Sequence, residues 1–287
     1  MLEIIQDTLI DAIKLLPFLF ITYLIMEYIE HKMGGKSKKA IKKSGKWGPV
    51  IGSILGVFPQ CGFSVSATNL YAGRVITLGT LIAVYLSTSD EMLPIFISET
   101  ISPIIILKIL GIKLIIGMIA GILIDIVLNI IKKNRQKEEN NEIGHMCEED
   151  HCHCDEKGIL KSATHHTLNI FLFIILITFI INIVVHFVGE EQIASWILNK
   201  PFIGPVIASL IGLIPNCAAS VIITNMYLEN VISLGSMISG LLTGAGVGLA
   251  VLFKTNDKLK ENIGIVALLY VIGVISGIVI DLIGITL

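Results

Sequence analysis

The sequence predicts an all-α polytopic membrane protein made of two inverted-topology repeats. Of its 287 residues, 54% are hydrophobic and 15% are charged, whereas soluble domains carry about 25% charged residues. The apolar residues form long blocks, such as 110–131 and 263–285, and about 20 apolar residues suffice to cross a bilayer as a helix. The first block, at about 8–30, is not preceded by a basic region and is not followed by a small-residue cleavage site. We therefore expect it to be a retained helix rather than a signal peptide.

An internal duplication relates the two halves of the chain. The stretch GPVIGSILGVFPQCGFSVSATNLYAGRVITLG (48–79) matches GPVIASLIGLIPNCAASVIITNMYLENVISLG (204–235) at a constant offset of 156 residues. The same offset aligns GMIAGILID (117–125) with GVISGIVID (273–281). The duplication predicts three parts, which are a first membrane repeat at 1–133, a linker at 134–163 and a second membrane repeat at 164–287.

The lysine distribution predicts which loops face the cytoplasm. The loops at 31–46, 132–137 and 254–260 are basic, whereas 98–102 and 189–196 contain no Lys or Arg. Basic loops are typical of the cytoplasmic side of a plasma-membrane protein. All three basic loops lie on that side only if the segment after the first of them enters the membrane and turns back. We then expect a cytoplasmic linker and two extracytoplasmic termini.

The segment that turns back is predicted to be a re-entrant helical hairpin, at 48–72 and again at 204–228. Pro59 and Pro215 would each break a helix there, because proline lacks the backbone N–H and clashes with the preceding turn. Each repeat then has about three transmembrane helices and one hairpin, which gives ten membrane segments when hairpin arms are counted. An odd number of crossings inverts the second repeat, and inverted repeats with broken helices at the midplane are typical of secondary transporters.

Polar side chains follow each proline at the same spacing. Gln60 and Asn216 supply amides at the two breaks, and Cys61 and Cys217 supply soft thiol ligands. Further polar residues follow each cysteine, mostly on one helical face. These additional substrate-binding candidates are Ser64, Thr68 and Asn69 in the first hairpin and Ser220, Thr224 and Asn225 in the second. Alternatively, small polar residues only allow the arms to pack closely.

Two carboxylates break the symmetry between the repeats. Asp90 and Glu91 lie in YLSTSDEMLP (85–94), within a predicted crossing at 75–97, whereas the corresponding GLLTGAGVGL (240–249) is uncharged. An intramembrane carboxylate is costly and is by default a functional candidate, here for cation binding or proton exchange. Both residues would otherwise be solvated near the outer interface. The glycines of the second copy should unwind its helix and expose backbone carbonyls.

Asp125 and Asp281 are equivalent residues late in the last helix of each repeat. They are candidates for proton relays or gates, and alternatively they cap or anchor helix ends. The preceding GxxxG pairs, at 117–121 and 273–277, predict close helix packing without chemistry.

The linker is the only long polar stretch and is rich in metal-ligand side chains. Short Cys/His-rich tracts bind soft or borderline metals, and thiols remain reduced in the cytoplasm. The spacing does not match a zinc finger, and a solvated acidic connector is the alternative interpretation. The metal-ligand candidates here are His145, Cys147, His151, Cys152, His153 and Cys154.

Several function classes lack a sequence signal. No G-x-x-x-x-G-K-[ST] phosphate loop occurs, so ATP-driven transport by this chain alone is not expected. No nucleophile–base pair is readable, so we expect no enzyme activity and no cofactor other than a metal ion as substrate or linker ligand. We expect the lipid bilayer as a partner and no nucleic acid; a homo-oligomer is compatible with the sequence.

With the paired PQC and PNC hairpins, the STSDEMLP segment and the His/Cys linker, the chain resembles the ten-transmembrane heavy-metal exporters over about 8–285. That family is related to arsenic-efflux permeases and is also labelled as manganese transporters. The resemblance implies export of a heavy metal or metalloid across the plasma membrane.

From the residues themselves we expect a secondary transporter whose substrate binds between the hairpin tips. Cys61, Cys217 and Asp90 would be the metal ligands in the membrane, with a proton as the expected coupling ion. An anion or small organic solute transporter, or a non-transporting membrane metal sensor, are the alternatives.

Overall fold

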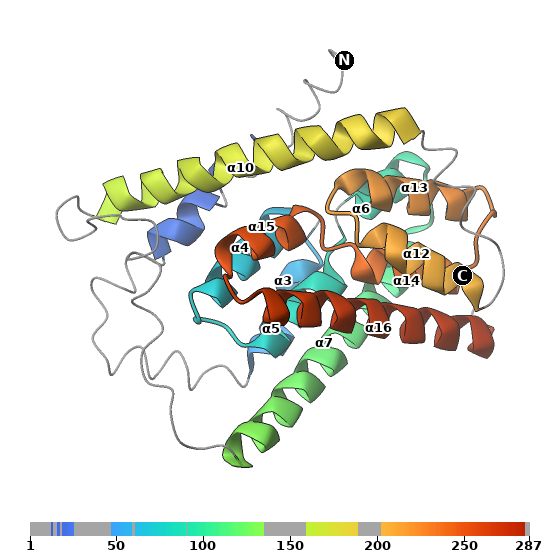
Figure 1. Cartoon of the computed structure of the whole chain (residues 1–287). Coiled ribbons are helices and arrows are strands. Elements are labelled where there is room, and N and C mark those ends of the chain that lie inside the picture. The colour runs from blue at the N-terminus through green and yellow to red at the C-terminus, as the bar shows by residue number, and fades with distance from the viewer. Residues whose placement is uncertain are drawn as a thin grey trace.

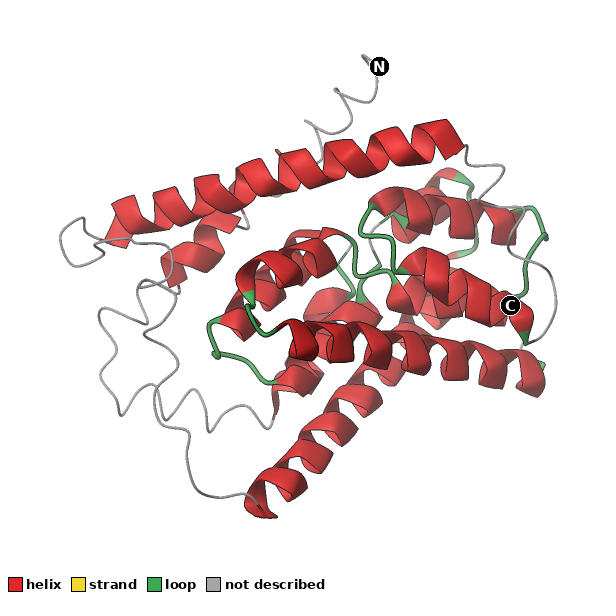
Figure 2. Ribbon diagram, in the orientation of Figure 1, coloured by secondary structure: helices red, strands yellow, loops and turns green. Residues whose placement is uncertain are grey.

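The computed structural model describes residues 13, 16–17, 19–25, 47–58, 61–89, 91–134, 159–188 and 202–284. Across these residues the regular elements are helices, with no strand (Figures 1 and 2). A helical segment at 19–25 comes first. The labelled helices follow in this order: α3 (Gly48–Gly56), α4 (Cys61–Ala72), α5 (Leu78–Ser87), α6 (Met92–Ser98), α7 (Pro103–Asn134), α10 (Ile159–Val188), α12 (Ile203–Gly212), α13 (Cys217–Leu228), α14 (Leu234–Thr243), α15 (Val247–Thr255) and α16 (Leu259–Ile283).

The duplication seen in the sequence recurs in the backbone. α13 begins and ends 156 residues after α4, and α14 is related to α5 by the same offset. The turns after α4 and α13 also match, because Arg74 and Asn230 both adopt a left-handed conformation, with φ angles of 57° and 59°. In the first turn Val75 N donates to Leu70 O at 2.8 Å, and the corresponding bond in the second measures 2.9 Å. α4 and α13 are therefore followed by the same left-handed turn.

A carboxylate ties the last helix of each repeat to the start of a neighbouring helix. Asp125 of α7 accepts hydrogen bonds from Thr77 Oγ1 at 2.6 Å and from the Gly79 amide at 2.9 Å, where α5 begins. Asp281 of α16 accepts the equivalent bonds from Ser233 Oγ at 2.8 Å and from the amide two residues later at 2.9 Å, where α14 begins. Such oxygens satisfy amides that lack a partner within their own helix. The helix-anchoring interpretation of both carboxylates is confirmed.

Glycine pairs bring the same helices into backbone contact. A Cβ atom at Gly121 would lie 2.5 Å from Gly79 O, and one at Gly277 would lie 2.5 Å from Gly235 O. No side chain fits at these crossings, so α7 approaches α5, and α16 approaches α14, as closely as backbones allow. The close packing expected of the GxxxG pairs is confirmed.

The central segment of each repeat is broken. α5 ends at Ser87 and α6 begins at Met92, while α14 ends at Thr243 and α15 begins after Gly246. Gly246 has φ 54° and ψ −144°, a conformation that glycine adopts far more readily than other residues. The sequence predicts this unwinding for the glycine-rich second copy, and that prediction is confirmed. The first copy, expected as one segment at 75–97, is broken as well.

Burial separates an interior set of helices from an outer set. Leu78–Ser98 and Leu234–Thr255 are mostly buried, whereas the residues of Pro103–Ile131 and Leu259–Ile283 are mostly half-buried or exposed. With Ala163–Ile180, these are the five stretches of the described chain that are long and apolar enough to cross a membrane. Figure 1 shows α10 along one side of the broken helices and α16 along the other. Ten membrane segments and the inversion of the second repeat stay predictions.

Helix α4, the second arm of the first predicted hairpin, packs on the second repeat. α4 makes more extensive contact with α15 than with α3, its own partner arm (Figure 1). At the end of α4, Arg74 Nη1 lies 2.8 Å from Glu261 Oε1, and Tyr71 OH also donates to Glu261. Arg74 Nη2 donates to Asn256 Oδ1 at 3.3 Å. Polar contacts of this network therefore join the two repeats.

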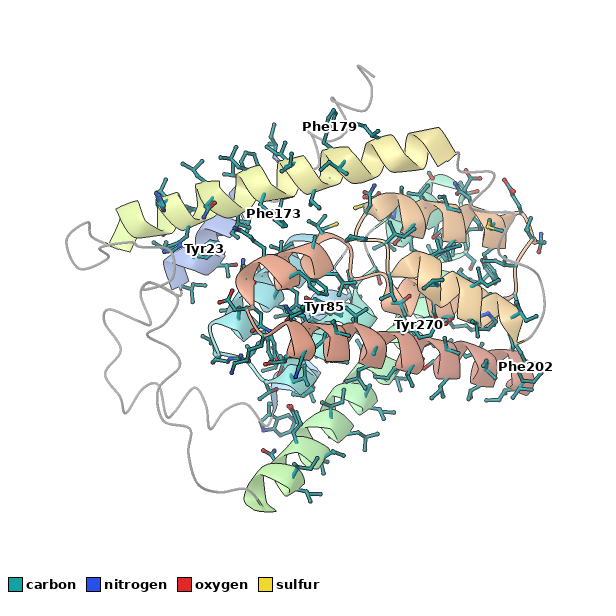
Figure 3. The ribbon with its side chains drawn as sticks, viewed as in Figure 1. Tyr23, Tyr85, Phe173, Phe179, Phe202 and Tyr270 are labelled. Carbon is teal, nitrogen blue, oxygen red and sulfur yellow. The ribbon has the colours of Figure 1, made fainter. Side chains whose placement is uncertain are left out.

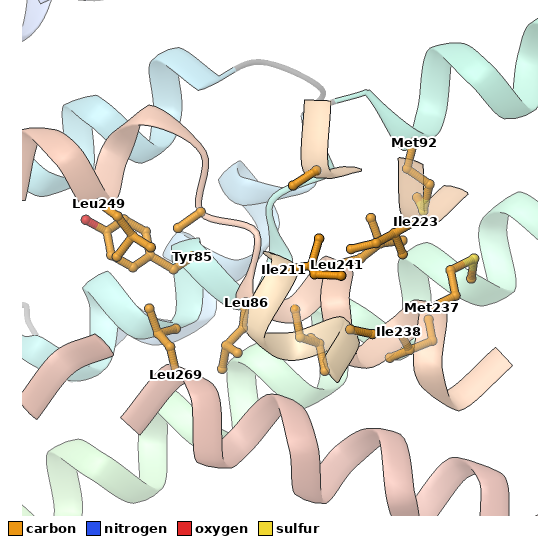
Figure 4. Packing of buried hydrophobic residues seen from close by; sticks show 14 of the residues in the cluster. Tyr85, Leu86, Met92, Ile211, Ile223, Met237, Ile238, Leu241, Leu249 and Leu269 are labelled. Atoms are coloured by element: carbon orange, nitrogen blue, oxygen red, sulfur yellow. The ribbon is translucent and has the colours of Figure 1, made fainter. Parts of the chain in front are cut away.

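The main hydrophobic core also lies between the repeats. Leu86 of α5 and Met92 of α6 belong to the same buried cluster as Leu241 of α14 and Ile223 of α13 (Figure 4). Tyr85 lies in the interior beneath α15, while Phe202 lies at the edge of the molecule (Figure 3). The two broken segments thus share one core, and the breaks occur inside it.

Candidate functional site

Two cysteines from different repeats meet at the predicted hairpin tips, where α4 and α13 begin. α4 begins at Cys61, four residues after the end cap of α3 at Val57, and α13 begins at Cys217, directly after the break that contains Pro215. Cys61 Sγ and Cys217 Sγ are 3.2 Å apart. The expected meeting of the two tips is therefore observed for these two residues.

The cysteine pair lies in a setting that favours negative charge. Both residues are half-buried thiols rather than a disulfide, and each occupies the first turn of its helix. The N-terminus of a helix carries the positive end of the helix dipole and unpaired amides. Metals bind the thiolate form of cysteine. The positive ends of two helices, α4 and α13, therefore lie at one pair of sulfur atoms.

Asn216 is the N-cap residue of α13 and precedes one of the cysteines. It is buried, with an extended backbone at φ −149° and ψ 152°, and its side chain makes no capping hydrogen bond to the helix. An amide in this position can offer both a donor and an acceptor beside the thiols.

The hydroxyl groups behind the cysteines bond to their own helices. Ser64 Oγ donates to Cys61 O at 2.8 Å, Thr68 Oγ1 donates to Ser64 O at 2.7 Å, and Thr224 Oγ1 donates to Ser220 O at 2.7 Å. Bonds of this kind satisfy a hydroxyl without a ligand. They favour the packing interpretation of Ser64, Thr68 and Thr224.

Ser64 and Thr68 also form the contact surface of α4 with α15. A Cβ atom at Gly248 would lie 3.0 Å from Ser64 Cβ, so α15 approaches α4 without a side chain between them. Thr68 Oγ1 is 2.5 Å from Tyr85 OH, and both hydroxyls lie 3.2 Å from Gly248 O. This buried network fixes the first hairpin against the second repeat. Tyr85 belongs to it, although the sequence offers no equivalent, since Leu241 occupies its place in the second repeat.

The remaining described candidates lie in different surroundings. Asn69 is buried and its Oδ1 accepts from Tyr23 OH at 3.3 Å, whereas Asn225, its counterpart, is exposed. Ser220 lies at the break of the second repeat, since a Cβ at Gly244 would be 3.3 Å from its Oγ. Glu91 is half buried at the start of α6. The structure therefore brings Cys61, Cys217 and Asn216 to the tips, and places Asn225 on the surface.

Some predicted site residues lie outside the described residues. These are Pro59, Gln60, Asp90 and all six His and Cys residues of the linker. Within the described part, no group of three or more His, Cys, Asp or Glu side chains could hold a metal ion. The cysteine pair thus offers two ligands there, and further ligands would have to be amide, carbonyl or water oxygens, or Asp90.

Lys113 is a buried charge that the sequence reasoning missed. Its side chain in α7 is fully buried, and Nζ donates to Thr88 O, at the end of α5, and to Leu241 O, 3.1 Å away in α14. The sequence signal for Lys113 is a difference between the repeats, because the second repeat has Leu269 at the equivalent position. An ionisable side chain inside a membrane helix is a functional candidate in its own right.

Long apolar outer helices around buried, broken inner helices define the chain as a multi-pass helical membrane protein. The sequence profile of a family described as "Putative, 10TM heavy-metal exporter" matches residues 1–190 and 158–286, which together span nearly the whole chain. The chain belongs to this family. No curated protein and no solved structure shows significant similarity to it.

Proposed function

We propose that the protein is a secondary transporter that exports a soft metal ion or metalloid bound between the two hairpin tips. The observation that carries the proposal is the 3.2 Å separation of Cys61 Sγ and Cys217 Sγ, which brings together one thiol from each repeat. A zinc–thiolate bond measures about 2.3 Å, so one ion of similar size could bridge these sulfur atoms after they move slightly apart.

The ligand type narrows the substrate class. Thiolates select soft and borderline species, whereas carboxylate, carbonyl and water oxygens suit Mn²⁺. A cysteine pair at the tips therefore favours ions such as Cd²⁺ or thiol-binding trivalent arsenic over manganese. Asp90 and Glu91 would add oxygen ligands or charge balance if they face the same space.

The division of the thiols between the repeats supports alternating access. If the second repeat is inverted, the hairpins enter from opposite faces, and a movement of one unit against the other exposes the pair to one side at a time. Movement at the shared core would also separate Cys61 from Cys217 and weaken binding. We propose a proton as the coupling ion.

The cellular arrangement follows from the same proposal. The protein would lie in the plasma membrane, with the linker in the cytoplasm and both termini outside. This orientation places the basic loops on the cytoplasmic side. The His/Cys linker would bind or deliver cytosolic metal. No enzyme activity and no resident cofactor are part of this proposal, and a homo-oligomer is compatible with it.

A second candidate function is the transport of an anion. The two helix N-termini at the cysteine pair would also stabilise a negatively charged solute through their amides. The two functions differ in their need for sulfur. Serine at both positions preserves the helix ends, so it should spare anion transport and abolish transport that depends on thiolates.

The proposal is tested by a metal challenge in cells. Cells that lack the gene, complemented with wild type or with Cys61→Ser/Cys217→Ser, would be grown with Cd²⁺, arsenite, Zn²⁺ or Mn²⁺, and cellular metal would be measured. We expect wild type to lower the content of at least one soft species and the double variant to fail. If wild type changes the content of no metal, the export proposal is wrong and a metal sensor becomes the better interpretation.

A further inference from the structure

Lys113 lies where two broken helices end. Its side chain is fully buried within Pro103–Ile131, a stretch long and apolar enough to span a membrane. The ammonium donates to the carbonyl oxygens of Thr88 and Leu241. Thr88 caps the C-terminus of α5, and Leu241 lies in the last turn of α14. One cation therefore binds the C-terminal end of a half-helix from each repeat.

These carbonyls are the kind that bind cations. The last four carbonyls of a helix lack partners within it, and the C-terminus carries the negative end of the helix dipole. In transporters with discontinuous helices, such half-helix ends and unwound carbonyls coordinate the coupling Na⁺ or H⁺. In this protein the Lys113 side chain occupies that position.

Close packing of α7 places the ammonium there. A Cβ atom at Gly117 would lie 2.9 Å from Ala83 O and 3.5 Å from Ser87 N, so α7 contacts the last turn of α5 directly. Lys113 precedes Gly117 by one helical turn and faces the same way. Its side chain consequently reaches past the end of α5. In the second repeat the corresponding Leu269 is also fully buried, so at this position the two repeats differ in charge and not in burial.

We propose that the Lys113 ammonium is a tethered cation that takes the place of a free Na⁺ or K⁺ ion between the two repeats. The role of Lys113 in coupling rests on the proposed transport function. The prediction that the site binds cations does not depend on that function. In wild type, transport should be independent of Na⁺ and K⁺. Removal of the side chain should leave a carbonyl site that a free monovalent cation or a small alkylammonium can fill.

The first test measures cation binding without transport. Full-length Lys113→Ala would be purified in detergent, and its melting temperature would be compared in choline, sodium, potassium and n-propylammonium chloride at equal ionic strength. We expect sodium or propylammonium to raise the melting temperature of the variant by several degrees over choline, as a ligand specific for the folded state does. Wild type and Lys108→Ala, which removes an exposed lysine of the same helix, should show no such difference. Equal melting of Lys113→Ala in all four salts would overturn the proposal.

The second test measures flux of Cd²⁺ and arsenite in proteoliposomes. Lys113→Ala should lose flux by roughly tenfold in choline, a typical coupling effect, and recover it in sodium or propylammonium. Wild-type flux that requires Na⁺, or full flux of Lys113→Ala in choline, would contradict the proposal.

Two further outcomes distinguish a failure of this proposal from a failure of the variant to fold and from a failure of the proposed transport function. Lys113→Gln keeps hydrogen-bond donors for the carbonyls without the charge, so it should fold even if the alanine variant does not. We expect it to lack flux in every salt; wild-type flux in this variant would overturn the role of the charge. If wild type moves no metal at all, the transport function fails, and the melting comparison still decides whether the site binds cations.

Discussion

The sulfur atoms of Cys61 and Cys217 lie 3.2 Å apart although 156 residues separate the two cysteines in the chain. Each sulfur belongs to the first turn of a helix that follows a break, and the two helices are equivalent members of the two repeats. The duplication thus places the two thiols side by side at the interface of the repeats.

This geometry predicts a shared reaction of the two thiols. In a protein whose linker cysteines, Cys147, Cys152 and Cys154, are changed to serine, one equivalent of phenylarsine oxide should protect two thiols from maleimide. Either Cys61→Ser or Cys217→Ser should abolish tight binding, and the double variant should be no worse, because residues that act as a unit are not additive. Mass spectrometry of the adduct checks the stoichiometry. Independent labelling of the two thiols after arsenical treatment would contradict the site.

The aspartates are predicted to stabilise the fold by equal amounts. Asp125→Asn and Asp281→Asn each weaken a pair of bonds at the start of a neighbouring helix, and loss of such a cap costs about 0.5–2 kcal/mol. Thermal melting in detergent should show similar decreases for both variants, with flux retained below the transition. Loss of flux at an unchanged melting temperature would instead support the proton-relay role.

Glycines at the helix crossings should tolerate no side chain. A Cβ atom at Gly79 would lie 2.1 Å from Gly121 O, and one at Gly235 would lie 2.2 Å from Gly277 O. Alanine at Gly79 or Gly235 should therefore separate the helices and abolish folding. Gly111→Ala and Gly264→Ala are the matched controls, because nothing lies within 4 Å of their Cβ positions, and each should stabilise its helix by about 0.5–1 kcal/mol. Expression and melting temperature distinguish the two groups, and a well-folded Gly79→Ala would refute the crossing.

The ion pair between the repeats should contribute little to stability. Arg74 and Glu261 have side chains that are 25% and 27% exposed, and pairs that reach solvent are worth at most about 1 kcal/mol. Arg74→Asn introduces the residue found at Asn230 of the second repeat, which tolerates the same positive φ. A double-mutant cycle with Glu261→Gln should give a small coupling energy. A coupling of several kcal/mol would instead identify a major connection between the repeats.

The repeat, the breaks at the hairpins and the anchoring carboxylates could be predicted from the sequence because each has a local signal. Pro215 and the equivalent proline mark helix ends by removing a backbone donor. A constant offset between the halves brings Cys61 and Cys217 to equivalent positions. The glycines around Gly246 mark the unwound segment of the second repeat.

Other features depend on packing between distant segments. The break after Ser87 has no proline or glycine at its position, and the packing of α4 on α15 is visible only when the repeats are assembled. In the sequence Lys113 is a single charge within an apolar segment, and only the structure shows its carbonyl partners. Asn225 is the equivalent of Asn69 in the second repeat but is exposed, because the two repeats pack against different neighbours.

The most direct test of the central claim is metal flux through the cysteine pair. Purified wild type and Cys61→Ser/Cys217→Ser would be reconstituted into proteoliposomes with a fluorescent Cd²⁺ indicator inside and a proton gradient across the membrane, with the linker-cysteine variant as control. We predict Cd²⁺ movement by wild type and by the linker variant, and none above empty liposomes by the double variant. Equal Cd²⁺ flux with and without Cys61 and Cys217 would contradict the account.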